Sequence, residues 1–166
     1  MANALENVQG DFFYTSGDIV EEGIERSRSS LRKRIILPIH IKQVASVQRM
    51  LNFLQPGTYI RPHKHPMPGA TESVVILKGK ICFFIFEDNG NILRSRILDE
   101  SALNSVADIE PGVWHSFIVL EKDTILFECK KGPYDAETDK IFAGWAPEEF
   151  TGEAGEYLKK METTLR

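Results

Sequence analysis

Short apolar runs separated by only a few residues fill the middle of the chain, and this texture limits it to a β-rich fold. Short strands with turn signals at such spacing are typical of a sandwich or a barrel. We therefore predict an all-β domain with strands at Ile35–Ile41, Ser46–Leu54, Ser73–Lys78, Lys80–Glu87, Ile92–Leu98, Val106–Ile109, His115–Leu120 and Thr124–Lys130.

Two of these runs are connected by a clear hairpin signal. The turn Asp88–Asn91 contains Asn89-Gly90, and Asn-Gly favours the positive φ angles of a type I′ turn. The run Ile81–Phe86 is apolar on both alternating faces, which predicts a strand buried on both sides. One face would line the barrel, and the other would contact a partner element or a second subunit.

A histidine pair provides the strongest chemical signal. Side chains alternate faces along an extended chain, so His63 and His65 project from the same face with their imidazoles converging. Pro62 and Pro66 lack the N–H that a central strand would need, so the pair is expected near the rim of a sheet. That position suits the mouth of a site.

Two further residues extend the pair to a candidate metal site. Glu72 opens an apolar run after the loop Pro66–Thr71, so it can point back towards the histidines. His115 follows the turn at Pro111-Gly112 and starts another strand. Three imidazoles and one carboxylate suit a divalent transition metal, either Zn, Fe, Ni, Co or Mn. His40 stands apart from this set, and we expect a structural role for it.

The spacing of these residues resembles the two motifs of the cupin superfamily. The first motif, G-x5-H-x-H-x(3,4)-E-x6-G, is matched with six residues instead of three or four before the glutamate, at Gly57, His63, His65, Glu72 and Gly79. The second motif is matched in register only at Gly112 and His115.

A finer resemblance is to the WbuC family of cupin-fold metalloproteins, over roughly residues 25 to 149. It is carried by the segments Val47–Asn52, Pro56–Pro66 and Gly132–Glu149. The resemblance implies a cupin double-stranded β-helix, or jelly roll, and a setting in O-antigen or other surface-polysaccharide synthesis. It leaves the individual roles of the site residues open.

Strand alternation places other side chains near the histidines. Arg61 and Tyr59 precede His63 on the same face, and Phe117 follows His115 on its face, so these three are candidate substrate-binding residues. A guanidinium beside a metal suits an anionic group. An outward salt bridge is an equal alternative for Arg61.

On the last predicted strand, Glu128 and Lys130 share one face and become candidate acid and base groups if that face is inward. The WbuC resemblance includes both residues together with Tyr134, Asp139 and Lys140. Glu128, Lys130 and Tyr134 therefore form the candidate catalytic set.

Composition excludes several classes of partner. The chain has 166 residues, a net charge of −4 and only short basic clusters, so nucleic acid is a poor candidate partner. No apolar stretch reaches the roughly 18 residues of a membrane helix, and the N-terminus has no signal-peptide pattern. A cytoplasmic location is the default expectation. Cys82 and Cys129 lie in apolar runs and are expected to be free.

The two ends of the chain are expected to pack on the barrel within one domain. Residues 1–34 form an arm and a helix near 18–29, capped by Asp18, residues 35–131 form the barrel, and residues 132–166 form an extension with a helix within Glu148–Leu165. The aromatic arm and the two-faced run Ile81–Phe86 predict a homodimer.

Three function classes remain open at this stage. The leading one is a metal-dependent cupin acting on a small polar or anionic, sugar-derived molecule, as an isomerase, epimerase or oxygenase. The second is a small-molecule or metal sensor without turnover, and the third is an interaction module with a structural metal. Fold alone does not decide among them.

Overall fold

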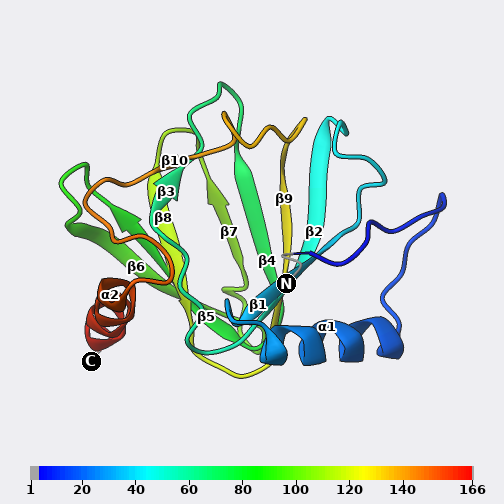
Figure 1. The fold of residues 1–166 in the computed structure, drawn as a ribbon, viewed down its shortest axis with the longest axis horizontal. Helices are drawn as coiled ribbons and strands as arrows, with labels where there is room; N and C mark the ends of the chain where they lie inside the picture. Colours follow the sequence, from blue (N-terminus) through cyan, green and yellow to red (C-terminus); the bar gives the residue numbers. More distant parts are fainter. Residues whose placement is uncertain (1–3, 166) are drawn as a thin grey trace.

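The structure, a computed structural model, describes residues 4–165. Strands dominate, and a helix lies near each end (Figure 1). In chain order the elements are α1 (Gly17–Ser29), β1 (Arg34–Pro38), β2 (Val47–Leu54), β3 (His63–Lys64), β4 (Glu72–Lys78), β5 (Lys80–Phe86), β6 (Ile92–Asp99), β7 (Val106–Ile109), β8 (Trp114–Val119), β9 (Thr124–Lys131), β10 (Ile141–Phe142) and α2 (Gly152–Thr163).

The strands form two five-stranded sheets, in the orders β1-β2-β9-β4-β7 and β10-β3-β8-β5-β6. Strands that are neighbours in a sheet pair antiparallel. The apolar core lies between the sheets, because buried side chains from both pack together there, among them Leu54, Val74, Leu126, Ile81, Phe83 and Phe117. This architecture confirms the predicted all-β class with peripheral helices.

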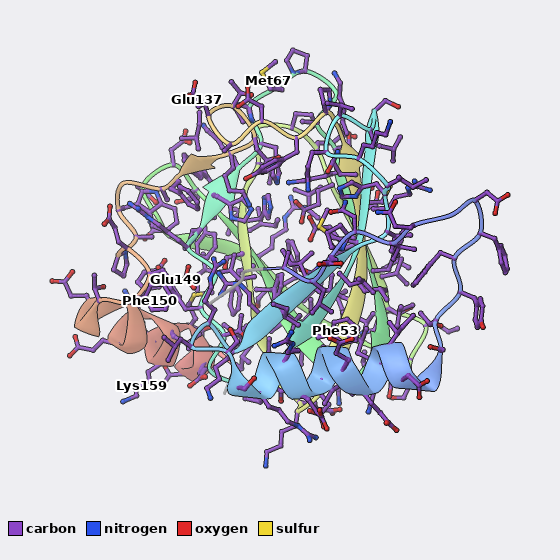
Figure 2. All side chains as sticks on the ribbon, turned by 45° about the vertical axis from the view of Figure 1, so that its right-hand side comes forward. Phe53, Met67, Glu137, Glu149, Phe150 and Lys159 are labelled. Carbon is purple, nitrogen blue, oxygen red and sulfur yellow. The ribbon has the colours of Figure 1, made fainter. Side chains whose placement is uncertain are left out.

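Helix α1 covers the outer face of β1 and β2. Its apolar side, with Ile19, Val20 and Ile24, packs on a cluster that includes Leu51 and Phe53. Figure 2 shows Phe53 next to the helix. The predicted cap was wrong by two residues, because the hydroxyl of Ser16, rather than Asp18, accepts the N–H of Ile19. A hydroxyl at the residue before the first helical turn satisfies a donor that the helix leaves free.

Helix α2 covers the second apolar face of β5. The inward face of β5 lies in the core between the sheets, whereas its outward side chains Cys82, Phe84 and Phe86 pack against α2 through buried side chains, Ala154, Leu158 and Met161. The partner on the second face is therefore an element of the same chain, and β5 by itself gives no reason for a second subunit.

The N-terminal arm lies beside β1. The N–H groups of Leu5 and Val8 donate to carbonyls of β1, and Phe13 packs against the cluster under α1. Phe12 and Tyr14 are 79% and 67% exposed. The homodimer stays a prediction, and this exposed aromatic pair is its remaining support.

The hairpin between β5 and β6 is confirmed, but its turn type was wrong. Gly90 has a φ of 88°, while Asn89 does not have a positive φ, so the turn is not type I′. Cys82 and Cys129 are free, as expected. No helix in the described part of the chain is long and apolar enough to span a bilayer.

Candidate metal site

The three histidines of the first candidate set converge at one place. β3 is only two residues long, because Pro62 and Pro66 flank the segment. Within it His63 is the direct Cα partner of His115 on β8. The imidazole centroids lie 4.5 Å apart for His63 and His115, 5.3 Å for His63 and His65, and 5.7 Å for His65 and His115.

Glu72 completes the group from the opposite sheet. It is the first residue of β4, and its Oε2 lies 2.7 Å from Nε2 of His65 and 3.9 Å from Nε2 of His115. One donor atom from each of the four residues lies within 4.8 Å of the others, and all four residues are buried. The long loop before Glu72 therefore does not prevent the carboxylate from reaching the histidines.

Backbone carbonyls orient all three rings. Nδ1 of His63 lies 3.0 Å from the carbonyl of Arg61, and Nδ1 of His115 lies 2.8 Å from that of Val113. Nδ1 of His65 lies 2.5 Å from the carbonyl of Asp139. A carbonyl can only accept, so each Nδ1 carries the proton. Nε2 is then the nitrogen available to a cation.

The electrostatics favour the metal-binding protonation states of His63, His115 and Glu72. Burial is the main reason why the pKa values of His63 and His115 lie below the ordinary value of 6.5. Burial also raises the pKa of Glu72, but the close contact of its Oε2 with Nε2 of His65 and the other nearby imidazoles outweigh it, so the pKa of Glu72 is lowered overall. Neutral imidazoles beside an ionised carboxylate are the ligand forms that metals need.

One atom indicates that the group fits a cation. Nε2 of His115 is buried and has no hydrogen-bond partner among the described residues. An unsatisfied buried nitrogen is costly in a folded protein, and this one belongs to the four-donor group. Three imidazole nitrogens and a carboxylate oxygen suit a divalent transition ion such as Zn, Fe, Ni, Co or Mn.

Glu128 lies beside this group on the inner wall. Leu126, on the same face of β9, belongs to the core between the sheets, so the face is inward. Oε2 of Glu128 accepts a hydrogen bond of 3.0 Å from Nδ2 of Asn52. Burial, and then the charge of Glu72, raise the pKa of Glu128 to about 7. The carboxyl can therefore hold or release a proton near neutral pH.

Lys130 shares that inward face and is already paired. Its Nζ lies 2.7 and 2.8 Å from the two carboxylate oxygens of Asp139. Burial lowers the pKa of Lys130, but the charges of Glu128 and Asp139 outweigh this effect and raise it overall. Lys130 therefore stays an ammonium ion. Tyr134 lies over it, with its ring centroid 5.9 Å from Nζ, and is 46% exposed.

Phe117 lies in the interior, separated from His115 by one aromatic ring. Its ring stacks on Phe83 at 6.1 Å, and Phe83 stacks on His115 at 5.8 Å. Phe83 therefore lies between Phe117 and the site, and the substrate-binding role of Phe117 stays a prediction.

The side chains of Tyr59 and Arg61 contact other parts of the chain. Residues 57–62 are not part of a strand, so the alternation expected from His63 does not extend back to them. The Tyr59 hydroxyl donates to the carbonyl of Pro147, and the Arg61 guanidinium donates to the carbonyl of Ala143 and pairs with Glu148. Their predicted role in substrate binding finds no support in these contacts.

Two contacts of the site could not be predicted from the sequence: that of Asp139 with His65 and that of Asn52 with Glu128. The resemblance included Asp139, but spacing cannot bring it to His65, because 74 positions separate the two residues. His40 is buried, and its Nδ1 lies 3.1 Å from the N–H of Arg49, on the neighbouring strand β2. This contact agrees with the structural role expected for His40.

A cavity of about 320 Å³ adjoins the site. It lies between the loop after His65 and the segment after β9, and it is lined by His65, Met67, Ala70, Lys130, Pro133 and Thr138. A larger hollow of about 630 Å³ lies between the N-terminal arm and α1, away from the histidines. The smaller cavity is the one that bears on the candidate chemistry, because His65 forms part of its wall.

Comparison with solved structures establishes the fold. An oxalate oxidase in complex with the substrate analogue glycolate is 17% identical with a TM-score of 0.53, covering 69% of this chain and 57% of that one. The Lactobacillus farciminis oxalate decarboxylase formate complex gives 19% and 0.50, covering 64% and 30%. The capsular polysaccharide assembling protein CapF from Staphylococcus aureus gives 20% and 0.53, covering 64% and 31%. The chain has the cupin fold and spans less than two thirds of each of these proteins.

Sequence comparison gives a family without a described activity. No curated protein matches the chain. One family model matches residues 16–98, which is half of the chain and includes α1, β1 to β5 and most of β6, with His63, His65 and Glu72. The chain therefore belongs to the family described as a domain of unknown function, DUF6016.

Proposed function

We propose that this chain is a metal-binding cupin that holds one divalent transition metal ion through His63, His65, Glu72 and His115. The observation that carries the proposal is the geometry of four buried donors within 4.8 Å of one another. Within that group, Nε2 of His115 has no hydrogen-bond partner in the described part of the chain, and a bound cation would satisfy it. Bound there, the ion supplies Lewis acidity at a site shielded from solvent.

The ligand that fits the surroundings is a small polar or anionic molecule. The inner wall supplies Asn52 as a hydrogen-bonding amide, Glu128 as a carboxyl that titrates near neutral pH, and Lys130 as a cation. The neighbouring cavity of about 320 Å³ is lined by His65 and Lys130. Among proteins with this fold, the oxalate oxidase and oxalate decarboxylase are named for a small dicarboxylate. We extend that class of ligand to this chain.

A setting in surface-polysaccharide synthesis is the finer part of the proposal. It is supported by the resemblance to the WbuC family and by the fold of the capsular polysaccharide assembling protein CapF. A sugar-derived acid would combine the negative charge expected of the ligand with the hydroxyl groups of a polysaccharide precursor. If the protein turns over its ligand, Glu128 is the group placed to move a proton as part of an isomerisation or epimerisation.

Cobalt spectroscopy tests the ligand class. The protein is stripped with a chelator and reloaded with Co²⁺, whose visible spectrum reports changes in its ligands. Glycolate, a 2-oxo acid and a nucleotide sugar are then titrated in turn, with and without oxygen. We expect at least one of these to change the spectrum in a saturable way. The His115→Ala variant is the control and is expected to give no spectrum of bound cobalt.

A structural metal is a second candidate, favoured by the burial of all four donors. In that case the cobalt spectrum would form but would not respond to any small molecule, and chelation would lower the melting temperature. A sensor without turnover would respond to a ligand but leave that ligand chemically unchanged. If the protein does not bind cobalt at all, the proposed metal site itself is contradicted.

A further inference from the structure

The three histidines are oriented in two different ways. His63 and His115 each lie against the carbonyl two residues before them, so their own strands fix their rings. His65 instead lies against the carbonyl of Asp139, a residue 74 positions away. The orientation of His65 therefore depends on where the segment that contains Asp139 lies.

That segment, residues 132–140 between β9 and β10, is called the strap below. Figure 1 shows it crossing from β9 to β10 at one end of the barrel. Its ends are fixed by backbone bonds, from the N–H of Gly132 to Ser46 and, just beyond β10, from the N–H of Ala143 to Pro62. Figure 2 places Met67, of the loop after His65, and Glu137, of the strap, at this same end.

The middle of the strap is held mainly by one residue. Among the described residues, the hydrogen bonds and ion pairs that join residues 135–140 to the barrel all come from Asp139. Other polar contacts there are internal, such as those from the N–H groups of Glu137 and Thr138 to Asp135. A segment with so few contacts has a low local stability.

The ion pair with Lys130 is what places Asp139. Both side chains are 8% exposed, and the ammonium contacts both carboxylate oxygens. Lys130 projects inward from β9, which is paired on both sides, with β2 and with β4. The strand therefore holds Lys130 rigidly for the contact. A buried carboxylate would be unstable without this partner.

We propose that the strap is a cover over the metal site, latched by the Lys130–Asp139 ion pair, and that closing the latch orients His65 for the metal. In this arrangement Lys130 is a positioning residue that acts through Asp139, rather than an acid or a base. The inference rests on the proposed metal site. Its mechanical part, a latch that fixes the ring of His65, holds independently of any ion.

The coupling has a direct consequence for ligand entry. The cavity beside the strap is bounded by residues on both of its sides, including Met67 and Thr138, so movement of the strap would widen it. Release of Asp139 from Lys130 would at the same time free the ring of His65. An open strap therefore means both easier entry for a small molecule and weaker retention of the ion.

The test compares two substitutions on the same strap. Asp139→Asn removes the carboxylate charge but keeps the backbone carbonyl that faces His65. Glu137→Gln makes the same chemical change at an exposed side chain. Lys130→Met, on β9, is a second latch variant, because it removes the other partner of the ion pair. Each full-length protein is examined for backbone hydrogen exchange in strap residues 134–140 and for the rate at which bound Zn²⁺ passes to a competing chelator.

We expect strap exchange and zinc loss to rise together, each by about tenfold or more, in Asp139→Asn and Lys130→Met, as for other residues that orient metal ligands. Glu137→Gln should stay within about twofold of wild type on both measures, and exchange in β4 and β8 should stay unchanged in all three. Faster strap exchange with unchanged zinc loss would overturn the coupling, and unchanged strap exchange would overturn the latch.

A readout without metal separates this inference from the metal site itself. Nitrogen-15 spectra of the metal-free protein should show a slowly exchanging Nδ1 proton on His65 in wild type and Glu137→Gln. We expect this signal to be lost in Asp139→Asn and Lys130→Met. If wild type binds no zinc but these spectra behave as expected, the metal site fails and the latch stands. If the signal persists in both latch variants, the latch fails whatever the zinc result.

Discussion

His63 and His115 face each other as Cα partners across β3 and β8, with their imidazole centroids 4.5 Å apart. The pairing joins a two-residue strand to a six-residue strand within the same sheet. Glu72 approaches from the other sheet, so the site forms where the two sheets meet. The metal group therefore depends on the packing of the whole sandwich, and not on a single loop.

Glu72→Gln tests whether the carboxylate binds the ion directly. In the unmodified protein, Oε2 of Glu72 lies 2.7 Å from Nε2 of His65. The amide keeps the size of the side chain but removes its charge. We expect zinc affinity, measured by competition with a chelator of known affinity, to fall by more than about 100-fold. A fall of only about 10–100-fold is typical of residues that merely orient a ligand, and that result would move Glu72 out of the coordinating set.

The sequence allowed the four donors to be predicted because each signal was local. Alternation placed His63 and His65 on one face, and turn and strand signals placed Glu72 and His115 at strand starts. Alternation failed for Tyr59 and Arg61, because the chain is irregular before β3 and their side chains bond to the segment 143–148 instead.

Long-range contacts account for the rest of what the sequence could not predict. The contact of Asp139 with His65 depends on the path of the strap, for which the sequence carries no periodic signal. The apolar second face of β5 predicted a partner, but only the packing of α2 identified it. The cap at Ser16 was missed because Asp18 and Ser16 are both good capping residues, and local pattern does not choose between them.

Gly23→Ala should destabilise the protein although alanine is the better helix former. Gly23 lies in α1 directly against the ring of Phe53, and an added methyl group would overlap that fully buried ring. Overpacking of this kind costs about 1–3 kcal/mol. Gly155→Ala in α2 is the matched control, because open space surrounds it, and it should stabilise by about 1 kcal/mol. Urea denaturation measures both, and equal effects of the two substitutions would contradict the packing at Phe53.

Glu128→Gln should change how the stability of the metal-free protein depends on pH. The pKa of Glu128 is raised from 4.5 to about 7 in the folded protein, mainly by burial. Between these values the folded state binds more protons than the unfolded state, so stability falls as pH rises from about 4.5 to about 7. The loss is on the order of 3 kcal/mol, and the glutamine variant should lack it.

The measurement is urea denaturation of both proteins across this range in the presence of a chelator. The difference between wild type and variant isolates the contribution of Glu128. A difference that does not vary with pH would show that Glu128 has an ordinary pKa in the folded protein.

The exposed aromatic pair tests the predicted homodimer. The ring centroids of Phe12 and Tyr14 lie 6.0 Å apart, and both side chains are largely exposed. A second copy of the chain is therefore expected to cover them. Light scattering should give twice the chain mass of 18.8 kDa, and replacing both residues by serine should shift the protein towards a monomer. A mass near that of one chain for the unmodified protein at micromolar concentrations would remove the dimer.

The central claim is that a single ion is held by His63 of β3, His115 of β8, His65 just after β3, and the carboxylate of Glu72. Metal analysis of the protein purified without added metal, and again after stripping and reloading with zinc, tests it most directly. We predict one ion per chain in wild type and less than a tenth of that in the single variants His63→Ala, His65→Ala and His115→Ala, each folded as judged by far-ultraviolet circular dichroism. The same metal content in His65→Ala as in wild type would contradict the assignment of the site.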